Sequence, residues 1–220
     1  YNDDISVVKP NVIRAIDSKI KLLIISDYPG RYEKQEGRAY VGPVGKKVLK
    51  DIHEYIGDIN ILVMNALNHY ALPSDAKKQC IYCLPYVKSQ IVSYAPTVIW
   101  FAGKIPYLLL KYKSPVKDEY EEALLFLNED IAVFNVRYRS AKFPSILTVN
   151  PALIFRNDWS EKLYKIYKKA LKTIKLIIEK MEDKGWIKAD LIFDVDADHI
   201  LSLIHISEPT RPLYISYAVF

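Results

Sequence analysis

Polar side chains that could do chemistry lie in two distant segments of the chain. Asp27 follows the aliphatic run 21–25 and precedes a Pro-Gly turn, and Asn150 follows the aliphatic run 145–149. Parallel strands of an open α/β sheet end at the same edge, and ligands bind outside that edge. The two segments are therefore predicted to be two halves of one pocket.

The polar side chains at the ends of these runs can form hydrogen bonds or stabilise charge. The carboxylate of Asp27 could orient a water molecule or stabilise positive charge, or it could hydrogen-bond its own turn. Asn65 ends a further aliphatic run, and its carboxamide can donate and accept hydrogen bonds at once, although asparagine is also a common turn former. Asn150 can donate a neutral hydrogen bond from the second segment.

Strands alternating with helices are predicted to position these residues. Strand patterns cover 21–26, 59–65, 97–102, 131–138 and 145–149, and helical patterns cover 44–56, 75–94, 103–112 and 158–184. The acidic, poorly patterned stretch 114–130 is predicted to be an insertion or a surface hairpin. This alternation predicts an α/β fold: one three-layer domain over 18–185 with a central, mainly parallel sheet covered on both faces.

The composition bounds the class of protein. With 220 residues and 50% hydrophobic content, the chain can bury a sizeable core. It has no apolar run as long as a membrane span, which predicts a soluble, cytoplasmic protein with no membrane partner. The net charge of +5 permits an anionic partner such as DNA without requiring one.

Both ends of the chain are expected to lie outside the domain. Residues 1–17 are interpreted as the end of a longer N-terminal segment, and 186–200 as a short extension. Residues 201–220 resemble a translated sequencing adapter and are expected to be a non-native tail. A hairpin around Pro209 and Pro212 is the alternative for this stretch.

The order of the motifs resembles that of the uracil-DNA glycosylase superfamily, especially its thermophile-type and phage-polymerase-associated branch. In that branch the first strand ends in Gly-Glu-Ala-Pro-Gly, a Gly-x-Pro-Phe-Val-Gly-x-x-Gly loop follows, and the last strand ends in His-Pro-Ala-x-x-x-Arg-Asn. The resemblance runs from about Leu22 to Leu171 and is strongest over 37–45, 83–86 and 151–157. It implies an enzyme that flips a base out of DNA and hydrolyses its bond to the sugar.

The resemblance also implies roles for individual residues. Catalytic roles fall to Asp27 and Asn150, base binding to Tyr28, Tyr40 and Asn65, and DNA-phosphate contacts to Gly42, Gly45 and Arg156. Arg139 is added to the phosphate contacts because it is basic and lies near the predicted pocket mouth. Tyr40 replaces the family's Phe and offers a face on which a base can stack, or it packs under the loop.

Besides Tyr40, three residues at these sites depart from the family pattern. Asp27 replaces Glu and is one methylene shorter, and Tyr28 replaces a small Ala and adds bulk to the pocket floor. Asn150 replaces the His that donates to the base carbonyl. Losing one such donor typically slows a reaction about 10²–10³-fold.

A metal cofactor is not expected. Cys80 and Cys83 form a single Cys-x-x-Cys inside a predicted helix, and a closed site needs four ligands. Relatives often carry an iron–sulfur cluster, of which Cys83 and His69 would be the remnants. Structural thiols are the favoured interpretation.

Basic side chains could contribute to a DNA-facing surface. One set lies along the helix 158–184 and is also explained as a solvated helix face. The other set lies nearer the predicted pocket: Lys104, Lys111, Lys113, Arg137, Arg139 and Lys142.

Three functions are compatible with these residues. The first is excision of uracil or a related deaminated base, by a monomer or by a domain of a phage-type replication protein in a bacterial, archaeal or virus-infected cell. The second is a catalytically degenerate DNA-binding or interaction domain, with Asn150 marking the lost His. The third is an unrelated nucleotide-binding α/β enzyme, which the absence of a Gly-x-x-x-x-Gly-Lys-[Ser/Thr] loop disfavours.

Overall fold

The computed structural model describes residues 7–70, 73–106, 131–138, 141–156 and 160–184. Within these ranges, six strands form one sheet in the order β1-β3-β2-β4-β6-β5. They are β1 (Asn11–Ile13), β2 (Lys21–Ser26), β3 (Asn60–Asn65), β4 (Val98–Ala102), β5 (Ala132–Tyr138) and β6 (Ala141–Thr148). The inner strands β3, β2, β4 and β6 run parallel, and the outer strands β1 and β5 pair antiparallel. The predicted α/β class with a mainly parallel sheet is confirmed.

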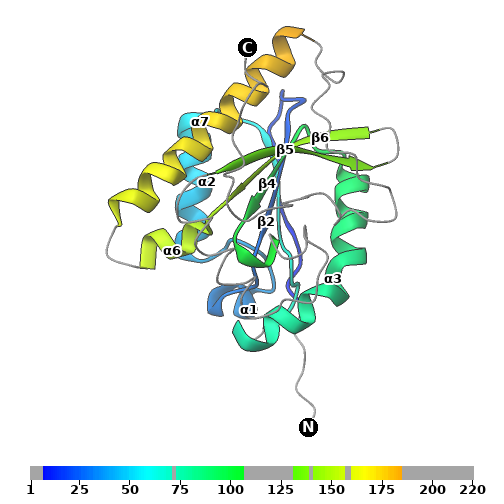
Figure 1. Cartoon of the computed structure of the whole chain (residues 1–220), viewed down its shortest axis with the longest axis vertical. Helices are drawn as coiled ribbons and strands as arrows, with labels where there is room; N and C mark the ends of the chain where they lie inside the picture. Colours follow the sequence, from blue (N-terminus) through cyan, green and yellow to red (C-terminus); the bar gives the residue numbers. More distant parts are fainter. Residues whose placement is uncertain (1–6, 71–72, 107–130, 139–140, 157–159, 185–220) are drawn as a thin grey trace, which may run out of the picture.

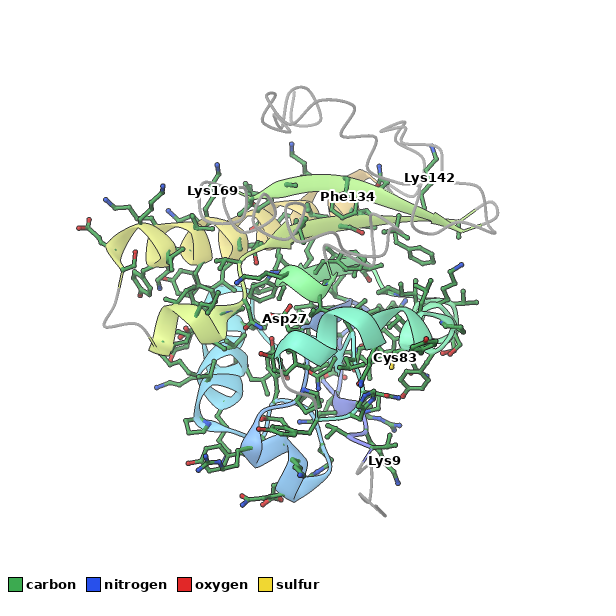
Figure 2. All side chains as sticks on the ribbon, turned by 60° about the horizontal axis from the view of Figure 1, so that its bottom comes forward. Lys9, Asp27, Cys83, Phe134, Lys142 and Lys169 are labelled. Carbon is green, nitrogen blue, oxygen red and sulfur yellow. The ribbon has the colours of Figure 1, made fainter. Side chains whose placement is uncertain are left out.

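Helices cover both faces of this sheet, which makes three layers (Figure 1). The helices are α1 (Arg31–Glu36), α2 (Pro43–Tyr55), α3 (Pro73–Tyr94), α6 (Pro151–Arg156) and α7 (Glu161–Lys184). α2, α6 and α7 lie on one face and α3 lies on the other, so Lys169 on α7 and Cys83 on α3 are on opposite sides of the sheet (Figure 2).

The core lies between these layers. β2 and β4 are almost continuously apolar, because a central parallel strand is covered on both faces. Trp100 on β4 is fully buried, and its indole N–H donates to Thr148 Oγ1 at 2.8 Å. α7 turns Ile166, Ala170 and Ile174 inward, as its sequence pattern predicted.

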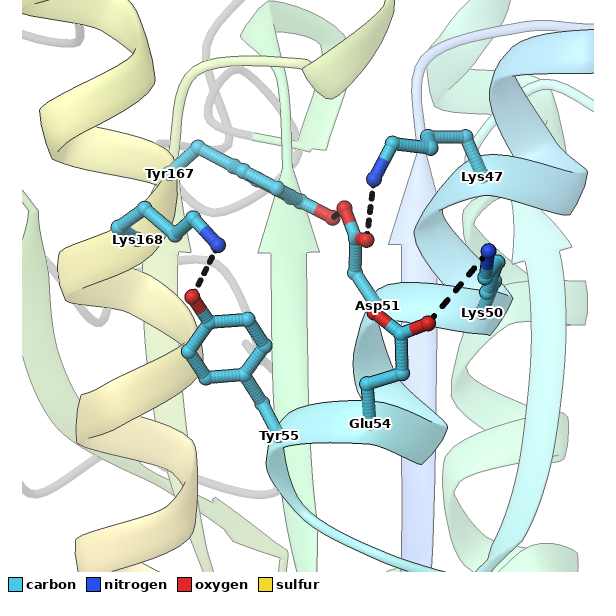
Figure 3. Close-up of polar contacts among 7 residues, drawn as sticks. All are labelled: Lys47, Lys50, Asp51, Glu54, Tyr55, Tyr167 and Lys168. Carbon is cyan, nitrogen blue, oxygen red and sulfur yellow. Dashed lines mark hydrogen bonds and ion pairs between the residues drawn. The ribbon is translucent and has the colours of Figure 1, made fainter.

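A buried polar cluster joins α2 to α7 (Figure 3). Asp51 is 2% exposed, pairs with Lys47, and accepts a hydrogen bond from the hydroxyl of Tyr167 at 2.9 Å. Nearby, Lys168 donates to the hydroxyl of Tyr55. Lys47 and Tyr167 thus give each oxygen of the Asp51 carboxylate a partner, as a buried charge requires.

Several features of the fold differ from the sequence prediction or lie beyond it. The sequence patterns predicted neither β1, α1 nor α6. The predicted segments 114–130, 186–200 and 201–220 lie outside the described residues. Within the described ranges, no helix is both long enough and apolar enough to cross a bilayer.

Candidate active site at the sheet edge

The parallel strands bring the predicted residues to one edge of the sheet. In the register of the sheet, Ser26 pairs with Asn65 on one side and with Ala102 on the other, and Ala102 pairs with Thr148. β2, β3, β4 and β6 therefore end side by side. Asp27 and Asn65, near the start of the chain, and Asn150, near the end of the domain, belong to the same edge.

Asp27 connects three of these strand ends. Its Oδ1 accepts the backbone N–H of Ile105 at 2.8 Å, and its Oδ2 accepts the Asn150 side-chain amide at 2.7 Å. The carboxylate lies so close to Gly103 that a Cβ at that position would overlap it. The alternative that Asp27 bonds only its own turn is therefore wrong, because its partners follow β4 and β6.

Burial dominates the electrostatics of Asp27. Desolvation raises the pKa of its carboxyl group above the ordinary value of 3.8. The hydrogen bonds from Asn150 and Ile105 and the charge of Lys104 act in the opposite direction without cancelling this rise. The carboxyl group is thus a weaker acid than an exposed aspartate, and proton uptake begins at a higher pH.

Asn150 is held at both ends of its side chain. Its Nδ2 donates to Asp27, while its Oδ1 accepts the backbone N–H of Ala152 at 2.8 Å and so caps the start of α6. A carboxamide nitrogen carries two hydrogens, so one N–H remains beyond the bond to Asp27. Asn150 can therefore offer a ligand one neutral hydrogen bond from a fixed position.

Tyr40 lies in the loop between α1 and α2 and points its hydroxyl at the end of β2. The hydroxyl is 2.6 Å from Ser26 Oγ, and either group could be the donor. Burial, together with the charges of Asp27 and Glu33, raises the pKa of the phenol despite the bond to Ser26. Tyr40 packs against the core and also borders the edge, where stacking on a base stays a prediction.

The predicted phosphate-binding glycines are already engaged within the protein. The backbone N–H of Gly42 donates to Glu33 Oε1 at 2.9 Å, and that of Gly30 donates to Glu33 Oε2 at 3.1 Å. Gly45 has no room for a side chain, since a Cβ would lie 2.5 Å from the Cα of Tyr40. A phosphate could reach the Gly42 N–H only if Glu33 moved away.

Asn65 is the least satisfied polar residue of this edge. It is 6% exposed, and its Nδ2 has no hydrogen-bond partner. Among the buried side-chain polar atoms of the described residues, only the Tyr94 hydroxyl shares that condition. Orphaned buried polar groups are rare in folded proteins and call for an explanation such as a missing ligand.

The remaining predicted site residues are Tyr28, which follows Asp27 in the turn after β2, and the two arginines Arg156 and Arg139. Tyr28 is partly buried and packs against the core. Arg156 lies in α6, with its side chain outside the description, and Arg139 lies outside the described residues altogether.

The predicted remnants of a metal site have protein partners. The thiol of Cys83 donates to Asn68 Oδ1 at 3.3 Å, and His69 Nε2 lies 2.6 Å from Gln79 Oε1. Burial raises the pKa of the Cys83 thiol, which disfavours the thiolate that binds metals. In the part of the chain that the structure describes, no three His, Cys, Asp or Glu side chains form a metal-binding group.

Sequence reasoning missed three residues that shape this edge: Ser26, Glu33 and Gly103. The spacing Gly30-x-x-Glu33 is that of a helix N-terminus closed by a glutamate at the third position, and it could have indicated Glu33. Gly103 was interpreted only as a helix start. Nothing in the sequence connects Ser26 with Tyr40.

Comparison with known proteins agrees with this geometry. The family description "Uracil DNA glycosylase superfamily" matches residues 13–175, which include every strand from β2 to β6 and the whole edge described above. No curated protein gave a match to the chain. A family match over well more than half of the sequence shows that the chain belongs to the uracil DNA glycosylase superfamily.

Proposed function

We propose that the protein is a DNA glycosylase that releases uracil, or a related deaminated base, after the base leaves the DNA stack. Membership of the superfamily supports a glycosylase-like function in general and DNA as its partner. The observation that carries the specific proposal is the buried, unpartnered Nδ2 of Asn65.

Asn65 gives the proposed site its preference for the base. Its Nδ2 is a donor, and the O4 carbonyl of uracil is an acceptor, so the two would satisfy each other. Cytosine presents an amino group at that position, which leaves the Asn65 donor buried without a partner. Leaving a polar group unpaired in this way is how a hydrogen-bonding site rejects a close analogue.

The remaining groups fit hydrolysis of the base–sugar bond. As that bond breaks, positive charge develops on the sugar and its electron pair leaves with the base. The carboxylate of Asp27 would stabilise the sugar cation and orient the attacking water, whose oxygen bonds to the sugar carbon and whose proton is released. The second N–H of Asn150 would donate to the base as its negative charge grows.

A catalytically degenerate DNA-binding domain is the second candidate, and one observation favours it. Asp27 and Asn150 bond to each other at 2.7 Å, so each already has a partner within the protein. In addition, because the pKa of Asp27 is raised, a larger fraction of its carboxyl groups is protonated and uncharged at mildly acidic pH than for an exposed aspartate. A retained fold with a self-satisfied pair could bind DNA without releasing a base.

A base-release assay distinguishes the two candidates. Wild-type protein is mixed with single- and double-stranded oligonucleotides that carry one uracil, and strand cleavage at the resulting abasic site is measured. A thymine-containing oligonucleotide is the control. Uracil-dependent cleavage that is lost in Asp27→Ala supports the enzyme. Intact DNA binding with no cleavage refutes it, and cleavage that then emerges in Asn150→His supports the degenerate site.

A further inference from the structure

We propose that Ser26 is a positioning residue for Tyr40, and that the two hydroxyls act as one unit that fixes the ring on which the expelled base stacks. The inference rests on the proposed function, because it assumes a base at this edge. It goes beyond that function by assigning a role to the side chain of Ser26, at a position where the family motif has Gly.

The bond between the two residues is short and partly buried. Ser26 is the last residue of β2, is 4% exposed, and is held by pairing with Asn65 and Ala102 on both sides. Its Oγ lies 2.6 Å from the Tyr40 hydroxyl. A hydrogen bond in partly buried surroundings is stronger than one that is fully exposed, because less water competes with it.

The other end of Tyr40 is fixed by its backbone. Tyr40 has φ of 57°, a left-handed conformation that side chains other than glycine adopt at a cost. α2 holds it there through Gly45, whose missing side chain lets the helix lie directly on the Tyr40 backbone. The preceding residue, Ala39, is fully buried and donates its N–H to Lys9 O at 3.0 Å.

The Tyr40 side chain is thus held at both of its ends, the Cα and the hydroxyl, so the direction of its ring is fixed. Without the Ser26 bond, the Tyr40 ring would depend on packing alone, and its hydroxyl would be left buried without a partner. Stacking on a flipped base needs a face in a fixed place, because small misplacements cost much of the benefit of orientation. Ser26 thus acts through Tyr40 rather than by touching the base.

The departures from the family motifs support treating the two residues as a unit. The motif described above has Gly where this chain has Ser26, and Phe where this chain has Tyr40. Phe has no hydroxyl to bond and Gly has no side chain to bond it. In this chain both changes are present, and the two added hydroxyls contact each other.

A double-mutant cycle tests the unit. The variants are Ser26→Ala, Tyr40→Phe and the double variant, and single-turnover release of uracil is measured for each. Ser145→Ala is the matched control. Ser145 is also a buried serine in a strand, and its hydroxyl donates to Phe143 O at 2.8 Å, which does not belong to a predicted site residue.

We expect Ser26→Ala to slow base release about three- to tenfold, the effect that one net hydrogen bond supports. The double variant should be no slower than Ser26→Ala, because Ser26 acts only through the Tyr40 hydroxyl, and Ser145→Ala should stay within about twofold of wild type. Equal slowing by Ser26→Ala in the wild-type and Tyr40→Phe backgrounds would overturn the proposal.

A measurement without DNA separates this proposal from the proposed function. A buried, hydrogen-bonded tyrosine hydroxyl exchanges its proton slowly, so Tyr40 should give a hydroxyl proton signal in the NMR spectrum of the free protein. That signal should persist in Ser145→Ala and disappear in Ser26→Ala. Its persistence in Ser26→Ala would refute the positioning role, whereas absence of base release by wild type would refute only the enzyme.

Discussion

Asn65 and Asn150 carry the same carboxamide at the ends of strands in one sheet, yet their hydrogen bonds differ. Asn150 uses its nitrogen for Asp27 and its oxygen for Ala152. Asn65 leaves its nitrogen buried and unpartnered. A buried donor without a partner costs about 1–3 kcal/mol, so Asn65 lowers the stability of the free protein. Residues retained at such a cost are expected to serve a ligand.

Replacing Asn65 should therefore separate stability from function. We expect Asn65→Ala to leave the free energy of unfolding within about 1 kcal/mol of wild type, because removal of the orphaned amide offsets the lost packing. Release of uracil should nevertheless fall by about 10²-fold or more, since a site donor is lost. Urea unfolding and single-turnover assays measure the two quantities.

Asn60 provides the matched control for this comparison. Its Oδ1 accepts the Ala15 N–H at 3.1 Å and its Nδ2 donates to Ser18 O at 2.6 Å, so both ends are satisfied. Asn60→Ala should lower the free energy of unfolding by about 1–3 kcal/mol, while the folded variant should release uracil at nearly the wild-type rate. A larger loss of stability in Asn65→Ala than in Asn60→Ala would contradict the interpretation of Asn65.

The raised pKa of Asp27 predicts a pH dependence of stability. The folded state holds this proton more tightly than the unfolded chain does, so the contribution of Asp27 is fully present below its ordinary pKa of 3.8. It is lost as the pH rises through the folded-state pKa. The unfolding free energy of wild type minus that of Asp27→Asn should thus decrease with rising pH from about pH 4 upward.

Urea unfolding at a series of pH values measures this difference. Asp27→Asn is expected to be less stable at every pH, because its new amide faces the Asn150 donor. That offset does not matter, since only the slope of the difference reports the titration of Asp27. A difference that increases with pH would mean that the hydrogen bonds outweigh the burial.

The types of the site residues could be predicted from the sequence, but their contacts could not. Asp27, Asn65 and Asn150 were found because each ends an aliphatic run, which is a local signal. Their pairing is not local: Asp27 and Asn150 are 123 residues apart, and their bond exists only in the folded sheet. For the same reason the role of Asp27 was interpreted as local to its turn or directed to substrate, when it also links three strands.

At the scale of elements, the number of periods that an element contains decided what could be predicted. β2, β3, β4, α2, α3 and α7 have 5–24 residues and carry an apolar run or a helical period. β1 has only three residues, and α1 and α6 have six each. Such short elements contain less than two periods of their own pattern, which is 2 residues for a strand and about 3.6 for a helix. They depend on tertiary partners, such as the pairing of β1 with β3.

The turn after β4 shows how one element end supports the site. Gly103 has φ of 133°, a conformation that favours glycine, and the Asp27 carboxylate occupies the place of its missing side chain. Gly57 has φ of 111° but meets no atom within 4 Å of a Cβ at that position. Alanine would be strained by the positive φ at either position, but only at Gly103 would its side chain also meet the Asp27 carboxylate.

Comparing Gly103→Ala with Gly57→Ala isolates that contact. Gly57→Ala should lower the free energy of unfolding by about 1–2 kcal/mol through backbone strain alone. Gly103→Ala should cost more by about 1–3 kcal/mol, because the new methyl group displaces Asp27 from its hydrogen bonds. Equal destabilisation, measured by thermal or urea unfolding, would mean that the carboxylate moves aside at no cost.

At the scale of the whole molecule, two groups of basic side chains in the described ranges lie on different surfaces. One is the outer face of α7, which turns its apolar side to β4, β6 and α2 and exposes Lys165, Lys169 and Lys172. The other is the sheet edge, where Lys104 follows Gly103 and Lys46 lies in the first turn of α2. Two of the helix lysines, Lys165 and Lys175, also pair with glutamates of α7 itself.

If DNA docks at the sheet edge, only the second surface should contribute to binding. Each phosphate contact that is lost lowers the dependence of log K on log salt by about one unit. Lys46→Gln/Lys104→Gln should therefore weaken DNA binding and reduce the slope by about 1–2, whereas Lys165→Gln/Lys169→Gln/Lys172→Gln should leave the slope within experimental error. Fluorescence anisotropy over a range of salt concentrations measures both quantities.

Uracil-free DNA is the appropriate ligand for this comparison, because the charge of Lys104 also lowers the pKa of Asp27 and could alter catalysis. The triple variant removes more charge than the double variant, so a general effect of net charge would weaken its binding more. A larger loss of both affinity and salt slope in the triple variant would place the DNA on α7, away from Asp27 and Asn65. The stronger effect of the two edge lysines is expected because Lys104 lies in the turn that contacts Asp27, and Lys46 lies in the helix that packs on the Tyr40 backbone.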